Sequence, residues 1–107
     1  MSGYDERQKA METKLAQSSE FRFKVTNRRN RLLGEWAAGL LGLEGEAADE
    51  HAKAVVMSDF EAPGDDDVVA KVLKDFADAG VSIDEAELRK KMAEFEPLAQ
   101  QQIFDQS

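Results

Sequence analysis

Apolar side chains recur every three or four residues along most of the chain, and this helical spacing constrains the fold more than any other feature of the sequence. No stretch alternates apolar and polar residues with the enrichment in β-branched side chains that marks a half-buried strand. At 107 residues, the chain has the size of one domain. The sequence therefore predicts an all-α domain whose helices each bury one face.

Four periodic segments are separated by short stretches that contain glycine or proline. We expect helices over about 20–41, 46–62, 65–79 and 82–105. Pro63 disfavours helical backbone in the residue before it, and Gly80 is suited to a helix end. Ser82 and Glu85 have the spacing of a capping box. Pro97 lies inside the last segment and should kink or break that helix.

Helices of this length joined by short turns predict a small antiparallel four-helix bundle, which we expect to occupy residues 20–107. Trp36, the only tryptophan, lies in the densest apolar stretch and should contribute to the core. The side chains expected to face inward are Phe21, Val25, Leu32, Leu33, Trp36, Ala37, Leu40, Leu41, Ala48, Ala52, Val55, Val56, Phe60, Val68, Val69, Val72, Leu73, Phe76, Ala86, Leu88, Met92, Phe95, Ala99 and Ile103.

Residues 1–19 form a segment of a different kind. Its periodic part, 4–17, reads as a polar helix with only three apolar residues on one face, Tyr4, Met11 and Leu15. Ordering a residue costs about 1–2 kcal/mol of backbone entropy, which three side chains cannot offset over such a length. We therefore expect the segment to be loosely ordered, or to be completed by a surface on which it docks.

The residues that enzymes and metal sites use are scarce. The chain has no cysteine and a single histidine, His51, which we expect at the surface. The run Asp65–Asp67 suits a helix N-terminus, and no phosphate-binding loop is present. The longest apolar run, 36–43, is too short to cross a membrane, and the start lacks a secretory signal. We predict a soluble, cytoplasmic, non-enzymatic protein without catalytic residues, bound metal or cofactor.

Charge is distributed unevenly. Residues 1–43 carry eight basic and five acidic side chains, whereas residues 44–107 carry six basic and seventeen acidic ones. The net charge is −8, yet five cations precede the apolar stretch, at Arg22, Lys24, Arg28, Arg29 and Arg31. Such asymmetry indicates that the two halves meet different neighbours.

Three interpretations of these cations remain open. They can belong to a solvated helix start and pair with acidic residues of the bundle, including Glu46, Glu50, Asp75 and Glu87. They can contact a protein partner with an acidic surface. A nucleic-acid-binding module is disfavoured, because the cations are few and residues 44–107 carry seventeen acidic side chains.

The stretch "RRNRLLGEWAAGLLG" from 28 to 42 is the most distinctive part of the chain. It follows "DERQKAMETKLAQSSEFRFK" and precedes "EAADEHAKAVV" and "DDDVVAKVLKDFADAGVSIDEAELRKKM". Over essentially its whole length, the chain resembles the zeta-type ATPase inhibitor subunits of alphaproteobacterial F-type ATP synthases. The resemblance implies a four-helix bundle with an N-terminal inhibitory segment. That segment would insert as a helix at the catalytic alpha/beta interface beside the gamma stalk and stop rotation.

Carried onto this sequence, the resemblance makes residues 1–19 the inhibitory segment, with cations beside its apolar stripe and further cations at the start of the bundle. The implied partner-binding residues are Tyr4, Arg7, Lys9, Met11, Lys14, Leu15, Arg22, Arg28 and Arg29. The implied partners are the alpha, beta and gamma subunits of the catalytic head, with no nucleic acid and no direct membrane insertion, and the free chain is expected to be monomeric. Some family members are thought to bind adenine nucleotide in the bundle, but no pattern in this sequence shows such a site. The alternative is a structural or assembly subunit that binds the same complex without inhibiting it.

Overall fold

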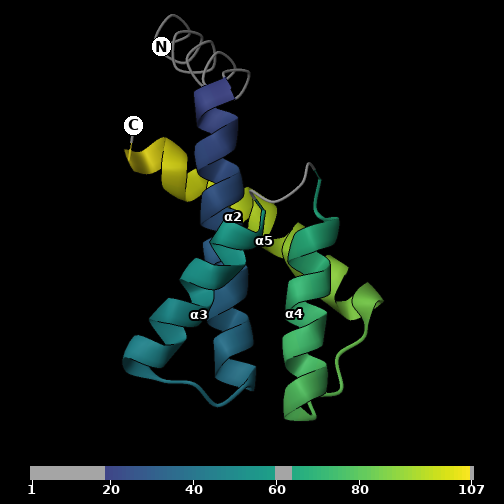
Figure 1. The fold of residues 1–107 in the computed structure, drawn as a ribbon. Coiled ribbons are helices and arrows are strands. Elements are labelled where there is room, and N and C mark those ends of the chain that lie inside the picture. The colour runs from purple at the N-terminus through teal and green to yellow at the C-terminus, as the bar shows by residue number, and fades with distance from the viewer. Residues whose placement is uncertain (1–18, 60–63, 107) are drawn as a thin grey trace, which may run out of the picture.

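The computed structural model describes residues 19–59 and 64–106. These residues form four helices, which confirms the predicted all-α bundle (Figure 1). The helices are α2 (Ser19–Leu40), α3 (Gly45–Ser58), α4 (Asp66–Ala79) and α5 (Glu85–Gln106). The predictions for residues 1–18 and for Phe60 lie outside the described part of the chain.

Helix α2 is the central element of the bundle, because its contacts with α3 and with α5 are the most extensive between described helices. It runs beside α3 over its second half, and α5 crosses it near its first half (Figure 1). Helix α4 completes the bundle by packing on α3 and α5. Residues far apart in the sequence therefore meet on α2, and its two halves have different neighbours.

The main core lies around the second half of α2. Its buried residues are Leu33, Ala37, Val55, Val68, Val69, Val72, Phe76, Leu88 and Met92. Trp36 is partly buried against this cluster and meets Phe76 edge to face, with ring centroids 5.8 Å apart at an interplanar angle of 85°. An edge-to-face pair is a favourable aromatic geometry. The expected contribution of Trp36 to the core is confirmed.

Helices α2 and α3 lie close together at Gly34. A Cβ atom added there would lie 2.7 Å from the Cα atom of Ala52, nearer than real Cβ atoms come to backbone. The absence of a side chain at Gly34 therefore allows the two helices to pack at this distance. Ala52 and Val55, on the facing side of α3, are fully buried.

A second, smaller cluster joins the start of α2 to the end of α5. Its buried members are Phe21, Val25, Ala99 and Ile103, with Leu32 and Phe104 packed against them. This cluster also explains how α5 continues past Pro97. The proline removes one backbone donor, but the residues beyond it are held on α2, and the helix remains a single element to Gln106. Of the two outcomes predicted at Pro97, a kink or a break, the break was wrong.

The predicted N-cap of the last helix was also wrong. Asp84, rather than Ser82, caps α5, because the backbone N–H of Glu87 donates to its carboxylate at 2.8 Å. Glu85 is the first residue of the helix. The helix end at Gly80 was predicted correctly: Gly80 adopts a left-handed conformation at φ 75°, and Val81 N–H donates to the carbonyl oxygen of Phe76.

Most residues expected to face inward do so, with two exceptions. Leu40, the last residue of α2, is 44% exposed, and Ala86, in the first turn of α5, is exposed. Both lie at helix ends, where the periodic face extends beyond the neighbouring helix. Helix α3 was expected to reach about residue 62. In the structure it ends at Ser58, and residues 60–63 lie outside the described ranges.

Candidate interaction surface

Nine residues were predicted to bind a partner, and the structure describes three of them. Tyr4, Arg7, Lys9, Met11, Lys14 and Leu15 lie outside the described residues. Arg22, Arg28 and Arg29 all lie on α2. Their surroundings differ, so each is considered by itself.

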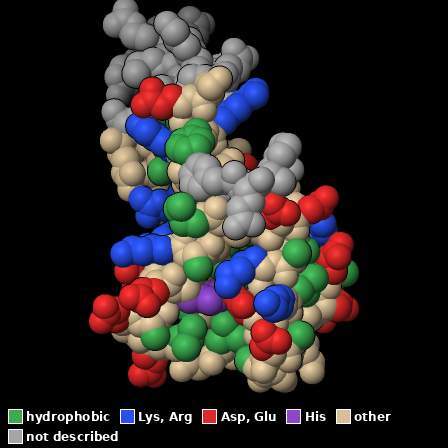
Figure 2. All heavy atoms as spheres, in the orientation of Figure 1, with side chains coloured by type: hydrophobic (Ala, Val, Ile, Leu, Met, Phe, Trp, Pro, Cys, Tyr) green, Lys and Arg blue, Asp and Glu red, His purple; other side chains and the backbone are tan. Residues whose placement is uncertain are grey.

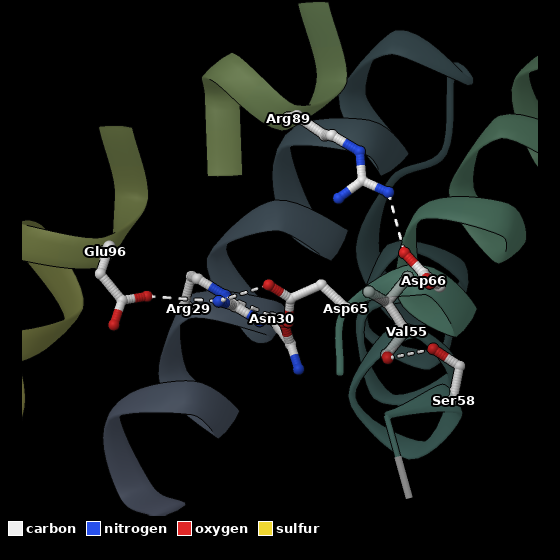
Figure 3. Close-up of polar contacts among 8 residues, drawn as sticks. All are labelled: Arg29, Asn30, Val55, Ser58, Asp65, Asp66, Arg89 and Glu96. Carbon is white, nitrogen blue, oxygen red and sulfur yellow. Dashed lines mark hydrogen bonds and ion pairs between the residues drawn. The ribbon is translucent and has the colours of Figure 1, made fainter. Parts of the chain in front are cut away.

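Arg29 is buried and engaged within the bundle. Its guanidinium donates to Asp65 at 2.7 Å and to Glu96 at 3.3 Å, and it also donates to the side-chain oxygen of Asn30 (Figure 3). Asp65 precedes α4 and Glu96 belongs to α5, so one side chain links three parts of the fold. Since Arg29 is only 8% exposed, we assign it to holding the bundle together and do not include it in a contact surface.

Arg31 joins α2 to α3. It donates to Glu35 on its own helix at 3.0 Å and also pairs with Asp49. The hydrogen bonds that Arg31 donates to Glu35 and Asp49 raise the pKa of Arg31. The hydrogen bond donated by Arg31, followed by that from Lys53, lowers the pKa of Asp49. Lys24, Arg29 and Arg31 thus pair within the bundle, as one interpretation held.

The acidic partners named for that interpretation were wrong. Of Glu46, Glu50, Asp75 and Glu87, none pairs with an α2 cation within residues 19–59 and 64–106. The actual partners are Glu20, Glu35, Asp49, Asp65 and Glu96.

Arg22 and Arg28 have no ion pair with any residue in the described ranges. Arg22 is exposed and Arg28 is half-buried. Both remain available to an external carboxylate, in contrast to Arg29. The sequence could not separate the three, because all are arginines within one basic run.

His51 was expected at the surface but bridges three helices instead. Its side chain is 9% exposed, with Nδ1 3.2 Å from the Gly34 carbonyl oxygen and Nε2 2.9 Å from the Asp75 carboxylate. The carbonyl and carboxylate oxygens are acceptors, so each bond uses a hydrogen on the ring nitrogen that faces it. Lys71 pairs with the same carboxylate at 3.0 Å.

Burial by itself raises the pKa of Asp75, but the hydrogen bonds from Lys71 and His51 outweigh it and hold that pKa below its usual value. Asp75 is therefore ionised near neutral pH and satisfied by two donors. This network lies at the α2–α3–α4 junction and explains how a histidine and a carboxylate are accommodated there.

Within the described residues, no group of three or more His, Cys, Asp or Glu side chains could hold a metal ion. None of the described helices has the length and apolar character needed to cross a membrane. The described residues form a helical bundle whose polar side chains join helices or lie at its surface.

Comparison with known proteins identifies the family of this module. The family model for the ATPase inhibitor subunit zeta matches residues 1–102, and the chain therefore belongs to that family. One solved structure, described as a solution NMR structure, is 40% identical, with a TM-score of 0.70, covering 80% of this chain and 98% of its own. None of the curated proteins matches the chain.

Family membership supports an inhibitory role at an ATP synthase, and it indicates a regulatory subunit rather than an enzyme. The resemblance found in the sequence is thereby confirmed at the level of the family.

Proposed function

We propose that this chain inhibits ATP hydrolysis by an F-type ATP synthase, by inserting its N-terminal helix at the catalytic alpha/beta interface beside gamma. The observation that carries the proposal is that the zeta family match begins at residue 1, so it includes the N-terminal segment as well as the bundle. The proposed partners are the alpha, beta and gamma subunits, on the cytoplasmic side of the membrane, and the proposed free form is a monomer.

The N-terminal segment has the composition of a helix that is completed by docking. Burying Tyr4, Met11 and Leu15 in a groove would contribute about 1.5–3 kcal/mol each. The nearby cations Arg7 and Lys9, with Lys14, would affect orientation and association rate more than affinity. The apolar stripe would supply most of the binding free energy, and the cations would orient the segment toward an acidic surface of the enzyme.

The bundle would anchor this segment. Helix α2 begins at Ser19, directly after it, and Phe21 and Val25 fix the first turns of α2 on α5. Arg22 is exposed on the same turns and would extend the contact. A docked N-terminal helix would therefore be attached to a packed body rather than to a loose chain.

The test is ATP hydrolysis by the purified cognate enzyme, titrated with full-length protein and with variants. Met11→Asp and Leu15→Asp should weaken inhibition steeply, because each places an unpaired charge in a dry groove. Thr13→Asp is the matched control, since residue 13 lies about 200° around the helix from both Met11 and Leu15. It adds the same charge and should change inhibition little.

Removal of residues 1–18 should abolish inhibition, with circular dichroism confirming that the bundle remains helical. Inhibition by this truncated form at full strength would refute the N-terminal mechanism. If the full chain binds the enzyme without slowing hydrolysis, the protein is a structural or assembly subunit of the same complex.

A further inference from the structure

A groove of about 880 Å³ lies where the first half of α2, the second half of α3 and the end of α5 meet. Four cations line it: Lys24, Arg28 and Arg31 from α2 and Lys53 from α3. Glu35 is the one acidic side chain among its lining residues. In a protein with 22 acidic and 14 basic side chains, this is a local reversal of charge.

The α2 wall of the groove is one face of a helix. Lys24, Arg28 and Arg31 are spaced by four and three residues, so their side chains follow one stripe. In the space-filling view, Lys and Arg side chains lie along the edge of α2 above α3 (Figure 2). The stripe begins five residues after Ser19, close to the point where the N-terminal segment enters the bundle.

These cations are available to a partner because their internal pairs are absent or weak. Arg28 has no ion pair with a described residue. Lys24 pairs with Glu20, and Lys53 with Asp49, each at 3.2 Å between residues four apart on solvent-exposed helix surface. Exposed pairs of this kind contribute only about 0.3–0.5 kcal/mol, so a partner carboxylate can replace them. Arg31 is held by Glu35 and Asp49 and keeps the two walls together.

The groove also offers an apolar contact between its charged walls. Met57 on α3 is 62% exposed, the largest exposed fraction among the large hydrophobic residues of the described chain, and Val56 beside it is half-buried. Methionine is flexible and adapts to varied apolar partners. A helix laid in a groove is recognised by apolar residues at helical spacing with charges on its flanks. Cations on the α2 and α3 walls, with an exposed methionine on the α3 wall, suit a helix that carries acidic residues beside an apolar face.

We propose that this groove binds an acidic helical segment of the enzyme's catalytic head, as a second contact beside the N-terminal segment. The proposal rests on the proposed function for the identity of the enzyme. Charge complementarity carries the choice of occupant, because the groove is basic in an otherwise acidic protein. The groove accelerates docking and holds the bundle on the head, and the N-terminal segment blocks the catalytic cycle.

The experiment compares full-length double variants for binding to the purified catalytic head. Arg28→Glu with Lys53→Glu reverses one charge on each wall of the groove. Lys74→Glu with Lys90→Glu is the matched control, because both lysines are exposed and have no ion pair with a described residue. At low salt the groove variant should bind at least about tenfold more weakly than the control, mainly through slower association, with a flatter salt dependence.

Circular dichroism and the milder pair Arg28→Gln with Lys53→Gln, which should weaken binding by a smaller factor, exclude a folding defect. The proposal is overturned if the groove variant binds the head like the control. It is also overturned if Mg-ATP alone binds wild type and is lost in the groove variant, or if the groove mediates self-association in sedimentation.

Failure of the groove and failure of the N-terminal mechanism give different results. If the groove variant binds as well as the control while Met11→Asp loses inhibition, the groove proposal fails and the proposed function stands. If wild type binds without inhibiting and the groove variant loses binding, the groove stands and the N-terminal mechanism fails. A head that binds no form of the protein overturns both.

Discussion

Adding a single methyl group at Gly34 tests the close contact between α2 and α3. A Cβ atom there would lie 2.7 Å from Ala52 Cα and 3.2 Å from the Cβ atoms of Ala52 and Val55. The nearest atom is backbone, which cannot move aside as the end of a flexible side chain can. Gly34→Ala therefore forces α2 and α3 apart. The Gly34 carbonyl also accepts from His51 at 3.2 Å, so the same shift lengthens that hydrogen bond.

The expected magnitude is the difference between two effects. Introducing a methyl group into a packed contact typically costs about 1–3 kcal/mol. Replacing glycine by alanine inside a helix contributes about 1 kcal/mol in the opposite direction. Since the clash is with backbone and a hydrogen bond is weakened as well, we expect a net loss of about 1–2 kcal/mol in the free energy of unfolding.

Gly39→Ala, in the same helix, is the matched control. A Cβ atom at Gly39 would have nothing within 4 Å, so only the helix-propensity effect applies. This variant should gain about 0.5–1 kcal/mol. Urea unfolding followed by circular dichroism measures both variants, and in thermal unfolding they should shift the midpoint in opposite directions. A Gly34→Ala protein as stable as Gly39→Ala would refute the close approach of α2 and α3.

Three further variants test the polar contacts and the aromatic pair. Asp75→Asn should destabilise the protein near neutral pH. Because the folded pKa of Asp75 is depressed, the difference in unfolding free energy between wild type and variant should shrink as pH falls below about 4. A difference that does not depend on pH would contradict this. Arg29→Met should lower the free energy of unfolding by about 1–3 kcal/mol, which is less than the loss of a fully buried pair because the partner carboxylates are partly exposed. Arg22→Met, the control, should change the free energy of unfolding in urea by less than about 0.5 kcal/mol. Trp36→Ala should cost about 3 kcal/mol by losing its contact with Phe76, and a loss below about 1 kcal/mol would place Trp36 outside the core.

The helices themselves could be predicted from the sequence because local signals agree with the packing. The residue at which the last helix begins could not be predicted from the sequence. Ser82 and Asp84 are both good caps, and each has a glutamate three residues later. The structure selects Asp84 because Val81 and Ile83 pack on the main core, which keeps the residues before the cap out of the helix.

The spacing of Arg29 along α2 indicates its structural role, although its charge suggests an exposed position. It lies four residues after Val25 and four before Leu33, which places it on the buried face of α2. Because Arg29 also belongs to a basic run, the sequence alone assigned it to a contact with a partner. The placement of His51 had no local signal, because its carboxylate partner is 24 residues away.

The two apolar clusters along α2 have a consequence for local opening of the native state. The smaller one holds only the first turns of α2 and the part of α5 beyond Pro97, and it is separate from the main core. A few buried side chains stabilise that end, so it can open at a lower free energy than global unfolding requires. Amide hydrogens after Pro97 should then exchange with solvent while those around Leu33 stay protected. One end of the bundle would then open and close independently of the main core, and this end adjoins in sequence the segment that we propose docks on the enzyme.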